Sequence, residues 1–380
     1  MPEPSTADPG VTLPTRMRAV QTTGHGGLEK LVYREDVATP APGAGEVLIQ
    51  VGACGMNNTD INTRTAWYSK SVVQATGAGG SDGFESAKSD DSTWGGDGLV
   101  FPRIQGADVT GIVVAVGAGV SASRMGERVL VDPWMRDADD PGDRTLAGYL
   151  GSERDGGYAE YTTVPAINAF PIRSRYSDAE LATFPCSYST AEYMLTRARL
   201  GEGESLLITG ASGGVGSGLV QLAKRRGAYV IAVAGSSKME AVGALGADCV
   251  IARDAENFES AVRAAAPDGE VQVVADVVGG AGFSRLLEVL ARGGRYVTSG
   301  AIAGPSVDLD LRTLYLKDLD LLGATVMPVG IFESLVGYIE AEEIRPMLAK
   351  TFALDEIPQA QTEFLHKQHV GNLVIAVRED

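Results

Sequence analysis

Cysteine and long apolar runs are scarce in this sequence. Its three cysteines, Cys54, Cys186 and Cys249, are odd in number and far apart, which excludes a disulfide framework and favours a reducing cytoplasm. No apolar run is long enough to span a bilayer. Residues 1–16 lack a basic stretch followed by an apolar one, so they do not resemble a secretory signal, and we expect a flexible tail.

Positive charge is also in short supply. The formal net charge of -17 at pH 7 would repel phosphate backbones and anionic lipids, so we expect neither nucleic acid nor a membrane as the main partner. A local basic patch could still hold one anionic ligand. With 380 residues, 44% of them hydrophobic, the chain exceeds the usual size of a single core, which predicts a soluble protein of two domains.

Strand and helix patterns divide the chain into two kinds of structure. Up to about residue 165 the patterns are mostly those of β-strands. From about Ser205, short strands rich in Val, Ile and Leu alternate with helices, which predicts an α/β domain with a parallel, doubly wound sheet. After about Ile344 strand patterns return. We therefore expect one domain over 17–167 with 344–380 and a second over 168–343.

A long segment without periodicity interrupts the first domain at residues 69–101. It is rich in Gly, Ser and Asp, and compact domains seldom carry so long a structureless loop unless it is a lid, a binding loop or a disordered insertion. The sequence leaves these alternatives open.

A glycine-rich turn stands between an apolar run and an amphipathic helix at LLITGASGGVGS, residues 206–217. Missing β-carbons allow a pyrophosphate to come close to the backbone, and the helix N-terminus offers free N–H groups and the positive end of its dipole. The turn therefore predicts a dinucleotide site. We expect its cofactor contacts from Ala211, Ser212, Gly213, Gly214, Val215 and Gly216.

The end of the second strand of this domain predicts which dinucleotide binds. A site for NADH usually has Asp or Glu about 20 residues after the glycines, where it holds the ribose 2′-hydroxyl. Here the strand ends in VAGSSK, residues 233–238, without a carboxylate. The hydroxyls of Ser236 and Ser237 and the ammonium of Lys238 suit the 2′-phosphate of NADP. A solvated lysine at a helix start is the alternative reading of Lys238.

Eight segments together resemble one superfamily. They are GACGMNNTDINTR, GADVTGIVVAVG, GERVLV, DGGYAEYTTVP, FPCSYSTAEYML, LLITGASGGVGS, GALGADCVI and HVGNLVI. The chain resembles the medium-chain dehydrogenase/reductase superfamily over 17–377. The resemblance implies a GroES-like, mostly-β catalytic domain and a Rossmann domain. It also implies a homodimer or homotetramer, in which the apolar edge strand within residues 319–326 is covered by a partner subunit.

The same resemblance bears on metal binding. The zinc-dependent branch carries Cys, a His-Glu pair and Cys where this sequence has Asn57, Ala107 with Asp108, and Cys186, and the structural four-cysteine lobe is absent. Zinc needs three or four protein ligands, so we expect no metal. Two alternatives stay open: an alcohol dehydrogenase with an atypical zinc site of Cys54, Asp108 and Cys186, and a non-catalytic NADPH-binding sensor.

The segment NNTDINTRTAWYSK is similar to the zinc-free quinone oxidoreductases and enoyl reductases. The resemblance implies that hydride passes from NADPH to a small-molecule enone, enoyl thioester or quinone. Asn57 and Asp60 would position the nicotinamide ribose and substrate, Asp108 would orient a neighbouring side chain, and Tyr68 would donate a hydrogen bond or proton. Helix capping by Asn57 and Asp60, and packing by Tyr68, are the structural alternatives.

Overall fold

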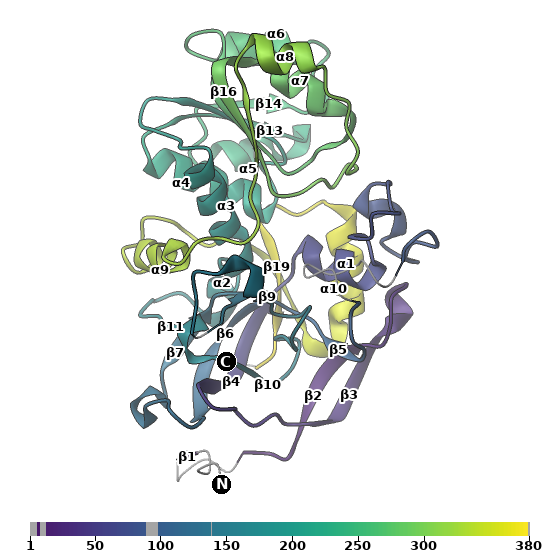
Figure 1. Ribbon diagram of the computed structural model, residues 1–380, viewed down its shortest axis with the longest axis vertical. Helices are drawn as coiled ribbons and strands as arrows, with labels where there is room; N and C mark the ends of the chain where they lie inside the picture. Colours follow the sequence, from purple (N-terminus) through teal and green to yellow (C-terminus); the bar gives the residue numbers. More distant parts are fainter. Residues whose placement is uncertain (1–5, 8–12, 89–97, 138, 379–380) are drawn as a thin grey trace.

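The computed structural model describes residues 6–7, 13–88, 98–137 and 139–378. Two bodies built on separate sheets lie one above the other in Figure 1. Most of the expected tail over 1–16 lies outside the described residues, as do residues 89–97 of the segment 69–101.

An eight-stranded sheet forms the lower body. Its main order is β11-β7-β6-β4-β19-β18, with β10 beside β4 and β1 beside β6. The strands are β1 (Thr6–Ala7), β4 (Glu46–Gly55), β6 (Asp108–Val116), β7 (Arg128–Val131), β10 (Tyr161–Pro165), β11 (Ala169–Pro171), β18 (Leu348–Ala353) and β19 (Asn372–Ala376). Because β19 pairs with β4, the end of the chain lies in the first sheet. β11 follows residue 168, where we expected the second domain to begin, yet it pairs with β7 of this sheet.

Two small sheets and ten α-helices, with several short 3-10 helices, complete the described secondary structure. The small sheets consist of β2 (Arg16–Thr22), β3 (Leu31–Ala38) and β5 (Arg103–Ile104), and of β8 (Trp134–Met135) and β9 (Gly148–Tyr149). The helices are α1 (Asn58–Thr65), α2 (Asp178–Leu181), α3 (Pro185–Arg197), α4 (Gly214–Arg225), α5 (Met239–Gly243), α6 (Phe258–Ala265), α7 (Phe283–Glu288), α8 (Leu311–Leu316), α9 (Ile331–Glu340) and α10 (Ile357–His366).

The upper body contains a six-stranded sheet whose strand pairs are all parallel. Its order is β14-β13-β12-β15-β16-β17, formed by β12 (Ser205–Ile208), β13 (Tyr229–Ala234), β14 (Cys249–Ala252), β15 (Val271–Asp276), β16 (Leu290–Thr298) and β17 (Asp320–Gly323). In chain order this is 3-2-1-4-5-6, the doubly wound Rossmann arrangement. The expected fold class is confirmed.

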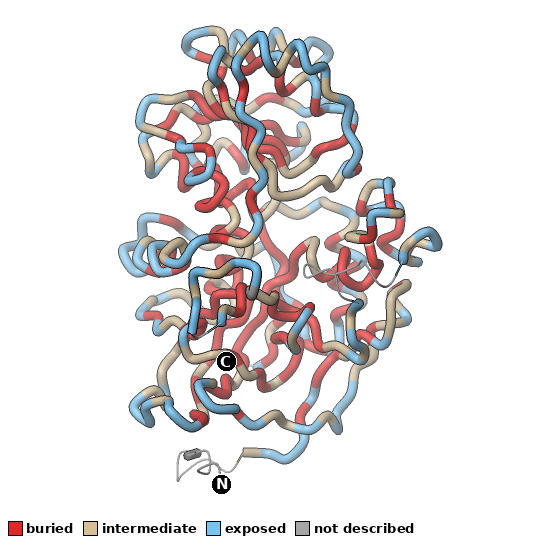
Figure 2. The backbone as a smooth tube through the Cα atoms, in the orientation of Figure 1, coloured by how far each residue is buried: buried red, intermediate tan, exposed pale blue. Residues whose placement is uncertain are grey.

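Alternating side chains explain why helices cover both faces of this sheet. Leu206 and Ile208 of β12 belong to the core shared with α3, α4 and α9, whereas Leu207 belongs to the core shared with α6 and α7. Successive side chains of a strand point to opposite faces, so a strand that is apolar throughout must be covered twice. Figure 2 shows the result as buried strands between helices that are exposed on their outer sides.

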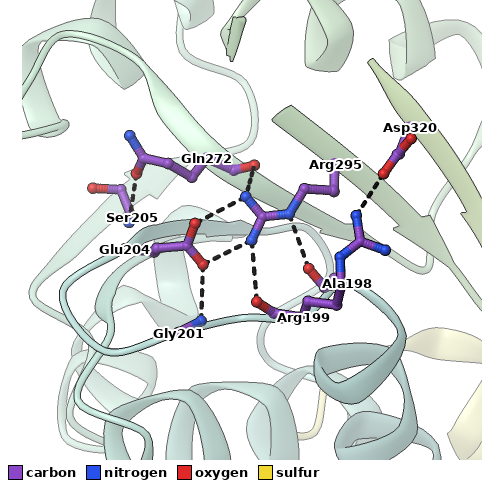
Figure 3. A network of polar contacts seen from close by, with 8 residues as sticks. All are labelled: Ala198, Arg199, Gly201, Glu204, Ser205, Gln272, Arg295 and Asp320. Atoms are coloured by element: carbon purple, nitrogen blue, oxygen red, sulfur yellow. Dashed lines mark hydrogen bonds and ion pairs between the residues drawn. The ribbon is translucent and has the colours of Figure 1, made fainter. Parts of the chain in front are cut away.

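A polar network joins the strands of this sheet near their amino ends (Figure 3). The Arg295 guanidinium in β16 donates to the Glu204 carboxylate just before β12, at 2.7 and 2.9 Å, and to the carbonyl oxygen of Ala198 at 2.9 Å. Arg199 pairs with Asp320, the first residue of β17, at 2.6 Å. Two ion pairs therefore lie at this end of the sheet. The opposite, carboxyl end is where a doubly wound sheet binds its ligand.

The described part of the segment 69–101 is fixed to both bodies. The buried guanidinium of Arg64 donates to the Gly80 and Gly26 carbonyl oxygens, at 2.6 Å each, and to Gln361 Oε1 of α10 at 2.9 Å. The Thr76 backbone N–H donates to the Ile302 carbonyl of the upper body at 3.1 Å. Residues 69–88 therefore bridge from the lower body to the carboxyl side of the Rossmann sheet.

Candidate active site

A cavity of about 1070 Å³ opens between the two bodies. Its lining includes residues at or just beyond the carboxyl ends of the Rossmann strands: Thr209, Ala234, Asp276, Thr298 and Gly323. The lower body contributes α1, residues 67–76 and the segment after α10. This volume exceeds the upper end of the range for pockets that take one drug-sized ligand, and it therefore suits a dinucleotide together with a small substrate.

The predicted glycine turn lies at the cavity and begins α4. A β-carbon on Gly216 would lie 2.2 Å from the Gly210 carbonyl oxygen, and one on Gly214 would lie 2.4 Å from Ser187 Oγ, so packing requires both glycines. A β-carbon on Gly213 would meet no protein atom nearer than 3.6 Å. The missing side chain of Gly213 therefore leaves space in the cavity, where a ligand can approach the backbone. The predicted residues that line the cavity are Ser212, Gly213, Gly214, Val215 and Gly216; Ala211 is buried in the core and does not line it.

The end of β13 brings positive charge to the same cavity. Ser237 and Lys238 line it, whereas Ser236 is exposed and its hydroxyl donates to Asp254 Oδ1 at 3.3 Å. Sequence reasoning missed further basic residues in the lining, among them Arg253 after β14, and Lys367 and His369 after α10. They come from distant segments, so no local pattern could have identified them.

Asn57 and Asp60 both act in capping α1, but only Asn57 lines the cavity. Asp60 Oδ2 accepts the Asn57 backbone N–H at 2.8 Å, and its Oδ1 accepts the Gly106 N–H at 3.2 Å. Burial raises the pKa of Asp60 to about 6 against the opposing effect of these hydrogen bonds. The contacts of Asp60 are therefore those of a helix-capping residue. Asn57 caps the helix as well, but its side chain also lines the cavity, where it can contact a ligand.

Asp108 at the start of β6 lies behind the cavity wall and orients Asn57. Its Oδ2 accepts from Asn57 Nδ2 at 2.9 Å, and its Oδ1 accepts the Cys186 backbone N–H, in the first turn of α3, at 2.8 Å. Burial raises the pKa of Asp108 to about 7, and both hydrogen bonds oppose the rise. Ser187 Oγ then donates to Asn57 Oδ1 at 3.2 Å and accepts from Asn372 Nδ2 at 2.9 Å. Sequence reasoning did not identify Ser187 and Asn372.

Tyr68 follows α1 and lines the cavity together with Trp67, whose ring centroid lies 5.7 Å from that of Tyr68. Burial raises the pKa of Tyr68 above its ordinary value, and a hydrogen bond with the Asn62 side chain opposes the rise. The phenol therefore stays protonated at neutral pH and is suited to donating a hydrogen bond. Asn57, Tyr149 and Cys186 are also part of the lining.

The candidate zinc ligands are occupied by other contacts. The buried Cys54 thiol contacts the Gly55 carbonyl at 3.8 Å, and Cys186 Sγ accepts the Tyr149 hydroxyl at 3.1 Å. Burial raises the pKa of both thiols. Within the ranges that the structure describes, no three His, Cys, Asp or Glu side chains are grouped to hold a metal ion. The atypical site of Cys54, Asp108 and Cys186 is not assembled here.

Two family models match a large part of the chain, and known proteins match almost the whole of it. The alcohol dehydrogenase GroES-like domain matches residues 43–174, and the zinc-binding dehydrogenase model matches residues 214–341. A structure from Sinorhizobium meliloti 1021, named as an alcohol dehydrogenase, is 49% identical with a TM-score of 0.85, covering 96% of this chain and 97% of that one.

Two further relatives are reductases. Acryloyl-coenzyme A reductase of Metallosphaera sedula is 29% identical over 370 residues, 94% of this chain and 99% of the relative. Quinone oxidoreductase of Rattus norvegicus is 27% identical over 368 residues, 94% of this chain and 97% of the relative. The lower body is thus a GroES-like domain and the upper one a Rossmann domain that binds a nicotinamide cofactor. Since these matches agree with the sheet order and with the position of the cavity, the chain belongs to the medium-chain dehydrogenase/reductase superfamily of oxidoreductases.

Proposed function

We propose that this oxidoreductase uses NADPH to reduce an activated carbon–carbon double bond, in an enone or enoyl thioester, or a quinone, without zinc. The observation that carries the proposal is the use of the Asp108 carboxylate. Both of its oxygens accept hydrogen bonds, from Asn57 and from the start of α3. In the zinc-dependent alternative the Asp108 carboxylate would be a metal ligand. Here it orients the side-chain amide of Asn57 beside the cavity.

The residues of the cavity fit a phosphorylated dinucleotide. Gly213 leaves space at the N-terminus of α4, which suits a pyrophosphate, and Lys238 stands where NADH-preferring sites place a carboxylate. The nearby Arg253 and Lys367 also line this part of the cavity. Because the whole chain carries a formal charge of -17, this local concentration of basic groups supports a ligand with an additional phosphate.

The cavity lining also fits a substrate that gains negative charge. NADPH, when bound, supplies the hydride, and the substrate carbonyl oxygen then needs a hydrogen-bond donor while the adjacent carbon takes up a proton. The protonated Tyr68 phenol is the proposed donor. Thr59 Oγ1 and Thr76 Oγ1, on residues that also line the cavity, are buried and have no hydrogen-bond partner among the described residues. They are further candidates for holding polar groups of the substrate.

A zinc-dependent alcohol dehydrogenase is the second candidate, because the Sinorhizobium meliloti relative is named as an alcohol dehydrogenase and one of the two matching family models is described as a zinc-binding dehydrogenase. NADPH oxidation in the presence of quinones, enones, enoyl-CoA thioesters and aldehydes separates the two. We expect turnover with members of the first three classes that a zinc chelator leaves unchanged. Turnover confined to aldehydes and lost on chelation would establish the second candidate.

Assembly and cellular location are part of the proposal. The edge strand β17 carries Leu321, which is 38% exposed, and nearby α8 exposes Leu311, Tyr315 and Leu316. An apolar sheet edge needs a cover, so we propose a homodimer or homotetramer. Among the described residues no helix is both long and apolar enough to cross a membrane. The three cysteines are unpaired, which supports a reducing cytoplasm.

A further inference from the structure

Asp276 ends β15 at the carboxyl edge of the Rossmann sheet, where it is fully buried at the cavity wall. The Tyr296 hydroxyl of β16 donates to its Oδ2 at 2.6 Å, and the Thr209 hydroxyl, directly after β12, donates to its Oδ1. The backbone N–H groups of Val278 and Gly279 donate to it at 2.8 and 3.1 Å. One carboxylate therefore holds together two neighbouring strands and the turn that follows it.

The contact between Thr209 and Asp276 lies where the strand order of the sheet reverses. β12 and β15 are the first and fourth strands of the domain in chain order and pair side by side, and a doubly wound sheet binds its dinucleotide across this point. The glycine turn and the end of β13 line the cavity on the β12 side. The loops after β15 and β16 are thus left for the second mononucleotide, the nicotinamide half. Val277 and residues 299–303 of these loops line the cavity.

The turn after Asp276 packs directly against the loop after β16. Gly280 has a φ of 65°, and a β-carbon on it would lie 2.8 Å from the Ala303 carbonyl oxygen. The Ala303 N–H donates to the Val278 carbonyl at 2.8 Å, and the Gly280 N–H donates to the Gly304 carbonyl at 3.1 Å. A displacement of the turn would therefore displace the loop after β16 as well.

We propose that Asp276 is a positioning residue for hydride transfer: its carboxylate fixes the turn 277–280 and, through it, residues 299–304, and these segments hold the nicotinamide in the orientation that the reaction requires. The proposal rests on the oxidoreductase function proposed above, but not on the choice between NADPH and NADH. A misplacement of about 1 Å can cost about 10²-fold in rate. The pyrophosphate site at α4 lies on the β12 side, so loss of the Asp276 carboxylate should lower turnover more than cofactor affinity.

Asp276→Asn tests this role both without and with cofactor. The amide keeps the size of the side chain, but its NH₂ group cannot accept a hydrogen bond. Hydrogen exchange of the turn 277–280 in the cofactor-free protein should become at least about tenfold faster. The kcat should fall at least about tenfold, while the Kd for NADPH, measured by fluorescence titration, should change less than about threefold. Unchanged exchange, or a Kd that rises as much as kcat falls, overturns the proposal.

Two substitutions of Thr209 keep the test informative if Asp276→Asn does not fold. Thr209→Val removes the hydroxyl that donates to Asp276 and accepts the Val277 N–H at 3.3 Å. It should change the exchange of the turn and kcat in the same direction as Asp276→Asn, by a smaller factor. Thr209→Ser keeps the hydroxyl and should behave like the unmodified protein. Equal behaviour of the valine and serine variants overturns the proposal.

Glu192→Gln is the matched control for a merely structural role. Glu192 is also a buried carboxylate, but it pairs with Arg226 at 2.6 Å and does not line the cavity. This variant should lower Tm without changing kcat or the exchange of the turn 277–280. If Asp276→Asn likewise lowers Tm and leaves kcat unchanged, the positioning role is overturned while the proposed function stands.

The two proposals fail in different ways. Absence of turnover with every substrate class of the screen would contradict the proposed function. The role of Asp276 would then be tested by the exchange of the turn and by the emission spectrum of bound NADPH, which depends on the surroundings of the nicotinamide ring. Faster exchange together with an altered spectrum in Asp276→Asn would support the role, and an unchanged spectrum would overturn it.

Discussion

The Asn57 side-chain amide donates a hydrogen bond from Nδ2 to Asp108 Oδ2 at 2.9 Å, and this contact determines which way the amide faces. An ionised carboxylate accepts hydrogen bonds and donates none. Asn57 Oδ1 is therefore directed to Ser187, whose hydroxyl donates to it at 3.2 Å. A protonated Asp108 could donate a hydrogen bond to the Asn57 amide instead of accepting one. The amide would then form the better hydrogen bond with its oxygen, rather than its NH₂ group, facing Asp108.

We predict that the activity depends on the ionisation of Asp108. Its pKa of about 7 means that the orienting carboxylate forms as the pH rises through 7, so kcat/KM should increase over that interval. Asp108→Asn should lower kcat/KM and remove this pH step, whereas Asp155→Asn, on an exposed side chain, should not. A variant that keeps the step would contradict the role of Asp108.

The raised pKa of Asp108 also predicts a trend in stability. Between its ordinary pKa of 3.8 and about 7, the unfolded chain loses this proton and the folded protein keeps it. The contribution of Asp108 to the free energy of unfolding should therefore be fully present below pH 3.8 and decrease until about pH 7. Denaturant titrations should show a smaller decrease in Asp108→Asn than in the unmodified protein.

We expect NADPH to bind at least about tenfold more tightly than NADH, which is about 1.4 kcal/mol. The reason is the pair of Ser237 and Lys238 at the position where a carboxylate would hold a ribose hydroxyl. Fluorescence titration measures both affinities. Lys238→Met should reduce the ratio. Lys30→Met should preserve it, since Lys30 pairs with Glu29 at 3.8 Å and does not line the cavity; equal affinities in the unmodified protein would refute the assignment.

Tyr68→Phe tests the proposed hydrogen-bond donor, since it keeps the ring and removes the hydroxyl. Positioned donors and acids typically contribute about 10²–10⁴ in rate, so turnover of an enone or enoyl thioester should fall at least about tenfold. NADPH affinity and Tm should hardly change. Tyr193→Phe, whose hydroxyl accepts from Arg144 at 3.0 Å outside the cavity lining, is the control. Near-normal turnover in Tyr68→Phe would rule out the Tyr68 hydroxyl as the donor and leave packing as the role of this residue.

Metal content follows from the contacts of Asp108 and Cys186. Elemental analysis of protein purified without chelators should find well below one zinc per chain, because the carboxylate and the thiol are engaged within the protein. Stoichiometric zinc that is lost together with activity in Cys186→Ala would instead favour the alcohol dehydrogenase.

Sedimentation velocity should show a dimer or tetramer that dissociates on dilution. Leu321→Lys places a charge on the exposed edge strand β17 and should shift the equilibrium toward the monomer. Ile167→Lys, at a residue that is 47% exposed in the other domain, should not. A monomer at all concentrations would contradict the proposed assembly.

Local patterns in the sequence were sufficient for the Rossmann domain and its glycine turn. Strands that are apolar on both faces predict a parallel sheet, and residues 206–217 place the turn between a strand and α4, where the structure has it. These predictions succeed because both features are encoded by residues that are close together in the sequence. A strand buried on both faces is apolar throughout, and a glycine turn that lets a phosphate approach the backbone is a short contiguous motif. The resemblance to the superfamily likewise depends on short contiguous motifs.

Only the tertiary structure decided which polar residues work together. Asn57 lies 51 positions from Asp108, Ser187 lies 185 from Asn372, and Lys238 lies 129 from Lys367. No periodicity relates such pairs, because they meet where strands and helices of different domains end. The same folding placed Asp60 and Asp108 behind the cavity wall and Ser236 toward Asp254. The sequence by itself determined the type of site, and the packing of the two domains determined which side chains line it, since burial and orientation depend on contacts between distant segments.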